Sequence, residues 1–359
     1  MKKTVKSSKK ILTNKKIWTI ILCSYILILI FFTFFDLKDF KPSFKSESNI
    51  QKILSEIANP EITELNKELY DLSMIKLANI KTNKDSSLWP ASSSYPNDGA
   101  VLPSRRIVAF YGNFLSKQMG VLGEYPESEM FERLNTELKK WNDADPETPA
   151  IPALQYIAVT AQGRPGEDGK YRLRMPDEQI EKAIEMAKKI NALVILDIQI
   201  GQSTIQNELP LLEKYLKLPQ VHLAIDPEFS MKFGRLPGIY VGTYDASEIN
   251  YVTDYLAKIV KENRLTPKVF VVHRYTKNMV TNLNQIKTVP EVQIIMDMDG
   301  WGPKSGKIAT YKNYIYPDPV QFTGFKLFYK NDLWKPSTAM MTPSEILELT
   351  PKPIYIQYQ

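Results

Sequence analysis

The sequence is poor in the residues that build disulfide frameworks and transition-metal sites. Its 359 residues include one Cys and two His. A single Cys excludes a disulfide framework and a Cys-based zinc site. No H-x-H or H-E-x-x-H spacing occurs, and no G-x-S-x-G nucleophile elbow is found. The first interpretation is therefore a protein with no cofactor and no resident metal ion.

The chain also lacks a net positive charge outside its N-terminal tail. It has 46 basic and 40 acidic residues, a net charge of +6, but residues 1–16 hold seven Lys and no acid. The other 39 basic residues face 40 acidic ones, which leaves a net charge of −1. This balance excludes nucleic acid as a partner on electrostatic grounds.

One long uncharged run follows the tail. Residues 17–35, IWTIILCSYILILIFFTFF, contain no charge. As a helix they would span about 28 Å, enough to cross a bilayer core. A buried core helix or a cleaved signal peptide are the alternatives, but no small-residue cleavage pattern follows. We expect an uncleaved transmembrane helix, which would make the chain a single-pass protein of the cell membrane. The Lys-rich tail would lie in the cytoplasm and the residues after the helix outside the membrane.

Residues 36–104 read as a juxtamembrane region. Apolar residues recur at helical spacing between residues 48 and 80, with a break at Pro60, which predicts two short amphipathic helices. They could pack on the following domain or pair with another chain. Residues 82–103 are rich in Ser, Pro, Asn and Asp and predict an extended linker.

From Arg105 onward, short apolar runs alternate with amphipathic stretches. Strands are expected at residues 107–111, 154–160, 193–200, 221–225, 238–243, 269–273, 292–296 and 354–358. Helical patterns lie between them. Eight strands and helices over about 255 residues predict an α/β fold, a (β/α)8 TIM-like barrel formed by residues 105–359 that should fold alone. An open doubly wound sheet is the alternative.

Polar residues recur where these strands end. Three apolar runs are each followed by an acid-x-polar pair, and other strand ends carry further polar groups. The residues are Asp197 and Gln199, Asp226 and Glu228, Asp297 and Asp299, His273 and Arg274, Tyr111, and Gln357. Residues i and i+2 of a strand share a side, so each pair can aim at one point above the barrel. The competing interpretation is that such acids cap the following helices.

A carboxylate-lined cleft suits glycoside hydrolysis, which needs a proton donor and a second carboxylate. Glu228 would be the acid, and Asp297 or Asp299, expected on roughly the opposite wall, its partner. Asp197 and Asp226 would raise the pKa of Glu228 by like charge. The expected substrate-binding residues are Tyr111, Gln199, His273, Arg274, Trp301 and Gln357. Further aromatic residues, Phe229, Tyr244 and Tyr275, could stack on sugars.

Two other functions remain open, so whether the chain is an enzyme is uncertain. A second interpretation uses side chains as metal ligands: Mg²⁺ or Mn²⁺ for phosphoester or deacetylation chemistry could be held by Asp197, Asp226, Glu228, Asp299 and His273. Alternatively, the barrel could bind cell-wall glycan or a partner protein without catalysis.

Several segments between Arg105 and Trp301 resemble a family of uncharacterised exported bacterial proteins. They are RIVAFYGN (106–113), MGVLG (119–123), IAVTAQG (157–163), LDIQ (196–199) and IDPE (225–228). The resemblance implies a barrel outside the membrane, with no established reaction. The Asp-x-Glu of IDPE is also similar to the catalytic pair of muramidase-type glycoside hydrolase barrels. Residues after Trp301 lie outside the resemblance and could form an insertion beside the site.

Overall fold

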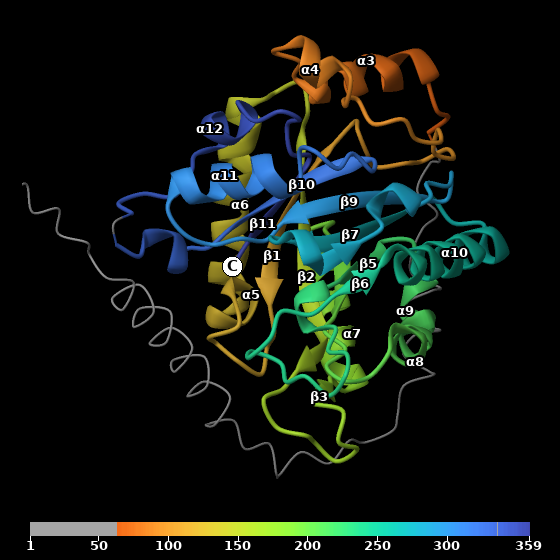
Figure 1. Ribbon diagram of the computed structural model, residues 1–359, viewed down its shortest axis with the longest axis vertical. Helices are drawn as coiled ribbons and strands as arrows, with labels where there is room; N and C mark the ends of the chain where they lie inside the picture. The colour runs from red at the N-terminus through yellow and green to blue at the C-terminus, as the bar shows by residue number, and fades with distance from the viewer. Residues whose placement is uncertain (1–62, 336) are drawn as a thin grey trace, which may run out of the picture. The chain divides into compact units, whose positions relative to one another are not determined.

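The computed structural model describes residues 63–335 and 337–359, and its centre is a closed barrel of eight parallel strands (Figure 1). Around the barrel the strands are β1 (Arg106–Gly112), β2 (Ala150–Ala161), β4 (Leu193–Ile198), β5 (Val221–Ile225), β7 (Lys268–Arg274), β9 (Val292–Met298), β10 (Phe322–Leu327) and β11 (Tyr355–Tyr358). β1 pairs with both β2 and β11, which closes the ring. The predicted (β/α)8 fold is confirmed.

The strands are buried on both faces because consecutive side chains alternate between two cores. On β1, Ile107 and Ala109 pack inside the barrel, whereas Val108 and Phe110 pack outside it. This burial explains why the strands read as continuous apolar runs rather than as an alternating pattern. It also fixes which side chains can reach the barrel axis.

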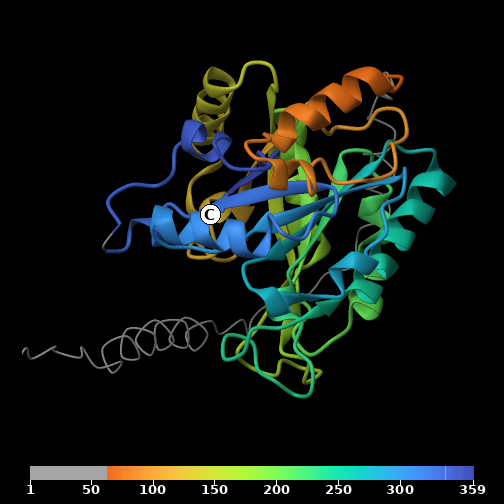
Figure 2. The same ribbon diagram turned by 45° about the horizontal axis from the view of Figure 1, so that its top comes forward.

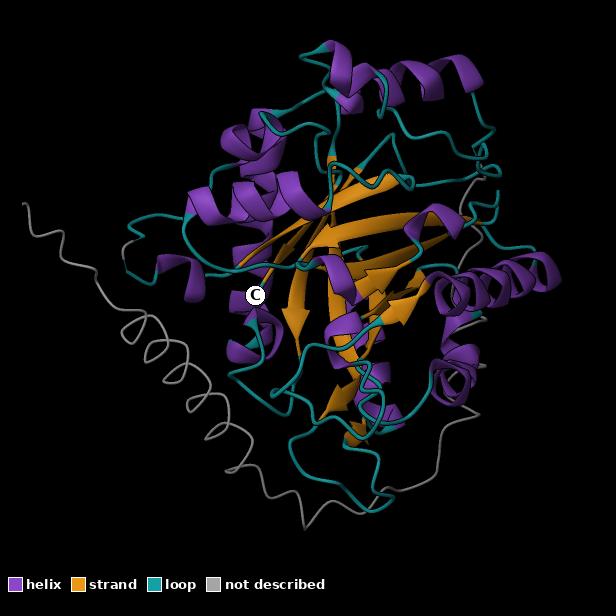
Figure 3. Ribbon diagram, viewed as in Figure 1, coloured by secondary structure: helices purple, strands orange, loops and turns teal. Residues whose placement is uncertain are grey.

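Helices cover the outer surface of the strands (Figure 3). They are α5 (Val121–Glu124), α6 (Glu127–Ala144), α7 (Asp177–Lys189), α8 (Ile205–Glu208), α9 (Glu213–Leu216), α10 (Ala246–Asn263), α11 (Lys304–Tyr314) and α12 (Pro343–Leu347). Short 3₁₀ turns are η1 (Leu209–Leu212), η2 (Pro227–Phe229), η3 (Lys277–Met279), η4 (Leu283–Gln285) and η5 (Asn331–Leu333). Long helices bury one stripe: α6 buries Met130, Leu134 and Trp141.

The prediction of a barrel strand at residues 238–243 is wrong, because this segment forms no strand. Gly238 has φ of 77°, and the segment folds back on the turn that follows β5, where Gly242 N donates to Glu228 O at 2.7 Å. The eighth barrel strand is instead β10, in the stretch that we expected to be an insertion. Two minor pairings complete the sheets: β3 (Arg172–Arg174) runs antiparallel to β2, and β6 (Tyr244–Asp245) pairs with β8 (Val280–Thr281).

A helix closes the barrel end where the strands begin. α3 (Lys67–Ala78) and the short α4 (Asn83–Ser86) lie across the end opposite α5 and β3 (Figures 1 and 2). Tyr70, Met74 and Leu77 of α3 belong to the same apolar cluster as the barrel interior. The backbone of Leu102 exchanges hydrogen bonds with the side chain of Gln293, at 3.0 and 2.7 Å. Residues 63–104 therefore pack on the barrel.

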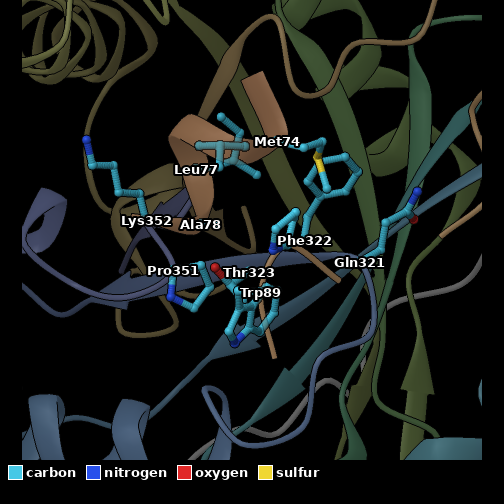
Figure 4. A pocket seen from close by; sticks show the side chains of 11 residues that line it. Met74, Leu77, Ala78, Trp89, Gln321, Phe322, Thr323, Pro351 and Lys352 are labelled. Atoms are coloured by element: carbon cyan, nitrogen blue, oxygen red, sulfur yellow. The ribbon is translucent and has the colours of Figure 1, made fainter. Parts of the chain in front are cut away.

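A small apolar crevice lies at this closed end (Figure 4). Its lining includes Met74, Leu77, Trp89 and Phe322, and no carboxylate contributes to it. The expected transmembrane segment, residues 17–35, lies outside the described residues. No helix of the described part of the chain is both long and apolar enough to span a membrane.

Candidate active site

The polar strand-end residues gather inside the barrel because they continue its inward-facing rows. Asp197 follows Ile195 on β4, and His273 follows Val271 on β7, each two residues along the same face. The apolar residues of these rows fill the closed end of the barrel, so the polar ones lie toward the carboxyl ends of the strands. This is the end at which (β/α)8 enzymes carry their sites.

His273 lies at the centre of a buried layer of charge. Its Nε2 is 3.1 Å from Asp197 Oδ2, and its Nδ1 is 3.1 Å from Asp297 Oδ2 and 3.3 Å from Asp299 Oδ2. Burial by itself opposes the charged ring, but the carboxylates of Asp197 and Asp299 outweigh it and raise the pKa of His273 well above its usual value. With the ring charged, both of its nitrogens donate to carboxylates.

Three amide and phenol groups complete this layer. Gln155 on β2 donates to Asp197 at 2.6 Å and accepts from the hydroxyl of Tyr355 on β11. Gln357, which we expected at the site, lies in the barrel interior, and its Nε2 donates to the hydroxyl of Tyr355 at 3.2 Å. Sequence reasoning missed Gln155 and Tyr355, because both lie within apolar runs rather than after them.

Asp299 is held by a second cation, Lys326, which sequence reasoning also missed. Lys326 Nζ is 2.9 Å from Asp299 Oδ1 and lies over the ring of Tyr111, 4.2 Å from its centroid. Lys326 is 3% exposed. Burial opposes its charge, but Asp299 outweighs burial and raises the pKa of Lys326. Its signal was a single Lys in the apolar run VQFTGFKLF (320–328).

Asp226 and Glu228 follow β5, where the turn η2 begins. The Asp226 side chain is the N-cap of η2, and its Oδ1 accepts from Glu228 N at 3.0 Å. The capping interpretation is therefore right for Asp226, which fixes the backbone from which Glu228 projects. Gln199 bridges the neighbouring groups, donating to Tyr111 at 3.2 Å and to Asp226 at 3.4 Å.

Glu228 is half-buried, unlike the four buried aspartates of the group. Burial and then the negative charge of Asp299 raise its pKa to about 7, while a hydrogen bond from Tyr275 works in the other direction. Burial is also the first cause of the raised pKa of Asp226 and of Asp297. Tyr275 thus contacts the acid, a role different from the sugar stacking that we expected.

Two expected binding residues do not join the cluster. Arg274 follows His273 directly, so its side chain takes the outer face of β7, where it pairs with Asp318 at 2.8 Å. That contact corrects its assignment to substrate binding. Trp301 lies beyond the buried layer, 47% exposed, beside Trp334.

The acids of β5 and β9 do not lie on opposite walls. β7 alone separates these strands, so they are two positions apart in a ring of eight. The expectation failed because it counted residues 238–243 as a barrel strand. The shorter separation brings the charge of Asp299 closer to Glu228, where it adds to the effect of burial in raising the pKa of Glu228.

The carboxylates are arranged around side-chain cations and not around a vacant centre. Within residues 63–335 and 337–359 no group of three or more His, Cys, Asp or Glu side chains is placed to hold a metal ion. One oxygen of Asp197 and one of Asp297 are buried without a hydrogen-bond partner. The backbone of Gly324 lies against the unpartnered oxygen of Asp297, because a Cβ at this position would be 2.4 Å from Asp297 Oδ1.

The sequence matches no protein-family model and no curated protein. Similar solved structures include a ruminal GH26 endo-β-1,4-mannanase, with 13% identity and a TM-score of 0.33 over 89% of this chain and 66% of that one, just under two thirds. A Bacillus subtilis mannanase has 11% identity and a TM-score of 0.37 over 84% of this chain and 87% of its own. These are mannanases and not muramidases, and scores this low carry no conclusion about activity.

Proposed function

We propose that this chain is a glycoside hydrolase of the cell envelope, with Glu228 as the general acid. The observation that carries the proposal is a half-buried Glu228 within electrostatic reach of Asp299, a carboxylate that contacts Lys326 and His273. Hydrolysis of a glycosidic bond uses two such carboxyl groups, one protonated and one ionised.

Glu228 has the surroundings of a proton donor. A pKa of about 7 keeps Glu228 protonated at acidic pH and about half protonated at neutral pH, and Tyr275 supports the carboxylate left after the proton is given up. The cap by Asp226 fixes the backbone of the turn. Glu228 would protonate the leaving glycosidic oxygen.

Asp299 is the proposed ionised partner. Its two oxygens face Lys326 at 2.9 Å and His273 at 3.3 Å. Two cations contact this carboxylate, an arrangement that suits a nucleophile or a base that activates water. Asp197 and Asp297 each contact a ring nitrogen of His273 at 3.1 Å. They would act as positioning residues, because they orient the ring that faces Asp299.

The substrate class follows from the proposed topology. Residues 17–35 would anchor the chain in the membrane and place the barrel outside. The polymers available there are envelope glycans. The exposed ring of Trp301, beyond the buried layer, matches the apolar face of a sugar ring.

Replacement of Glu228 by Gln tests the proposal. We expect Glu228→Gln to lower kcat on the responsive glycan by roughly 10²- to 10⁴-fold with binding retained, because the amide cannot donate the proton. Wild-type activity should fall as the pH rises through about 7. Turnover would be followed by reducing-end release from peptidoglycan and from soluble mannan, glucan and chitin oligosaccharides.

The exposed Glu132 on α6 gives a matched control. Glu132→Gln should leave turnover unchanged. No turnover by the wild type on any of these glycans would overturn the proposal and leave a binding barrel. Loss of activity on addition of a chelator would instead favour the metal-dependent alternative.

A further inference from the structure

Two exposed tryptophans lie together beyond the acid cluster. Trp301 follows β9 and Trp334 follows β10, and their rings meet edge to face with centroids 5.1 Å apart at 69°. They are 47% and 45% exposed, whereas the other two described tryptophans, Trp89 and Trp141, are buried. Packing thus explains Trp89 and Trp141 but leaves almost half of the surface of Trp301 and of Trp334 open to solvent.

A buried ion pair fixes the loops that carry the two rings. Asp332 lies two residues before Trp334 and is 1% exposed. It accepts from Gly302 N, next to Trp301, at 3.0 Å and pairs with Lys307 of α11 at 2.9 Å. A buried pair with several hydrogen bonds holds its neighbours in one geometry. The exposed aromatic surface is therefore pre-organised.

The same network joins the tryptophans to the acid cluster. Lys307 Nζ donates to the backbone oxygens of Gly300 and Lys326, each at 2.8 Å. Gly300 follows Asp299, and Lys326 is the ion-pair partner of Asp299. Trp301 and Trp334 are thus anchored to the residues that hold the proposed ionised carboxylate.

We propose that Trp301 and Trp334 form a stacking subsite for a sugar ring of a glycan chain whose cleaved bond lies at Glu228 and Asp299. This inference rests on the proposed function and extends it to the substrate, an extended glycan longer than the sugars at the acids. The axial C–H groups of a pyranose ring pack on the electron-rich face of an indole, and two rings held in place lose little entropy on binding.

Binding of defined hexasaccharides by the full-length chain tests the subsite. The probes are cellohexaose, mannohexaose and chitohexaose, titrated by calorimetry in a detergent without a sugar headgroup. Glu228→Gln is the background, so that turnover does not interfere. We expect Trp334→Ala to weaken binding of the preferred hexasaccharide roughly tenfold, Trp301→Ala to act similarly, and Trp334→Phe to restore most of the affinity.

Leu333→Ala is the matched control, because Leu333 is the neighbour of Trp334 and is 46% exposed but has no aromatic face. It should bind as the background does. No binding of any hexasaccharide, or equal binding by the Trp334→Ala variant, would overturn the subsite.

The two proposals fail separately. Trp-dependent binding without turnover by the wild type supports the subsite and contradicts the hydrolase. Turnover with an unchanged KM in the Trp301→Ala and Trp334→Ala variants supports the hydrolase and contradicts the subsite.

Discussion

At the residue scale, Glu228 differs from three of the neighbouring aspartates because it makes no ion pair among the described residues. Asp197, Asp297 and Asp299 are each paired with His273, and Asp299 also with Lys326. Glu228 makes no ion pair within the described part of the chain: burial and the charge of Asp299 raise its pKa, and they outweigh the charges of Lys326 and His273, which lower it. Its environment therefore favours the protonated form, which is useful for catalysis and unfavourable for stability once the group ionises.

This difference predicts how stability depends on pH. The pKa of Glu228 rises from 4.5 to about 7 on folding, so between these values the unfolded state loses the proton and the native state keeps it. The contribution to stability is complete below the unfolded pKa and is lost as the pH rises through the folded one. Glu228→Gln removes the loss and should raise the free energy of unfolding by roughly 3 kcal/mol at about pH 8 and by little at about pH 4.

Chemical denaturation at the two pH values measures the effect. Glu132→Gln, at an exposed position of α6, should change stability little at either pH. A Glu228→Gln variant that is less stable at the higher pH would contradict the assigned environment.

At the element scale, β10 is the strand that completes the site. It supplies Lys326, and its Gly324 lets Asp297 and Tyr355 approach from the neighbouring strands. A Cβ at Gly324 would be 2.4 Å from Asp297 Oδ1 and 2.8 Å from Tyr355 Cδ1. The strand therefore needs a glycine for space and not for an unusual φ.

Gly324→Ala should destabilise the fold by about 1–3 kcal/mol, because the added methyl displaces side chains in a packed barrel. Urea unfolding measures this change. Gly306→Ala in α11 is the control: its Cβ would meet only Pro303, at 3.7 Å or more, and alanine is the better helix former. Equal stability of the two variants would show that the barrel yields at Gly324 without cost.

The elements also show where sequence patterns sufficed. Seven of the eight expected strands are barrel strands, because buried parallel strands appear as apolar runs. Residues 238–243 have the same apolar texture, but Gly238 and Gly242 turn the segment back on the β5 turn. β10 was missed because we took the residues after Trp301 as an insertion beside the site.

At the scale of the whole molecule, the barrel depends on residues that precede it. Tyr70, Met74 and Leu77 of α3 pack in the cluster that fills the closed end, together with Leu102. This arrangement changes the expectation that residues 105–359 fold alone. Removal of α3 would expose the apolar end of the barrel interior to water.

Two truncated chains check this dependence. A fragment beginning at residue 63 should unfold cooperatively, whereas one beginning at Arg105 should aggregate or bind a hydrophobic dye, because it exposes several side chains each worth about 1.5–3 kcal/mol when buried. Thermal unfolding and dye fluorescence distinguish the fragments. Equal stability would show that α3 packs on the barrel without supporting it.

The sequence by itself determined the barrel and the polar residues at the ends of its strands. Apolar runs of strand length, each ending in acid-x-polar, are local patterns, and the period of two in a strand places both polar residues on the inner face. Asp197, Asp226, Glu228, Asp297, Asp299, His273 and Gln199 were found in this way.

Only the tertiary structure decided how these groups pair. The cations on Asp299 come from β7 and β10, Gln155 and Tyr355 come from β2 and β11, and the separation of Glu228 from Asp299 depends on which strands close the ring. Such contacts join residues far apart in the chain. Charge pairing and burial set the pKa of Glu228, and both depend on neighbours that no local pattern identifies.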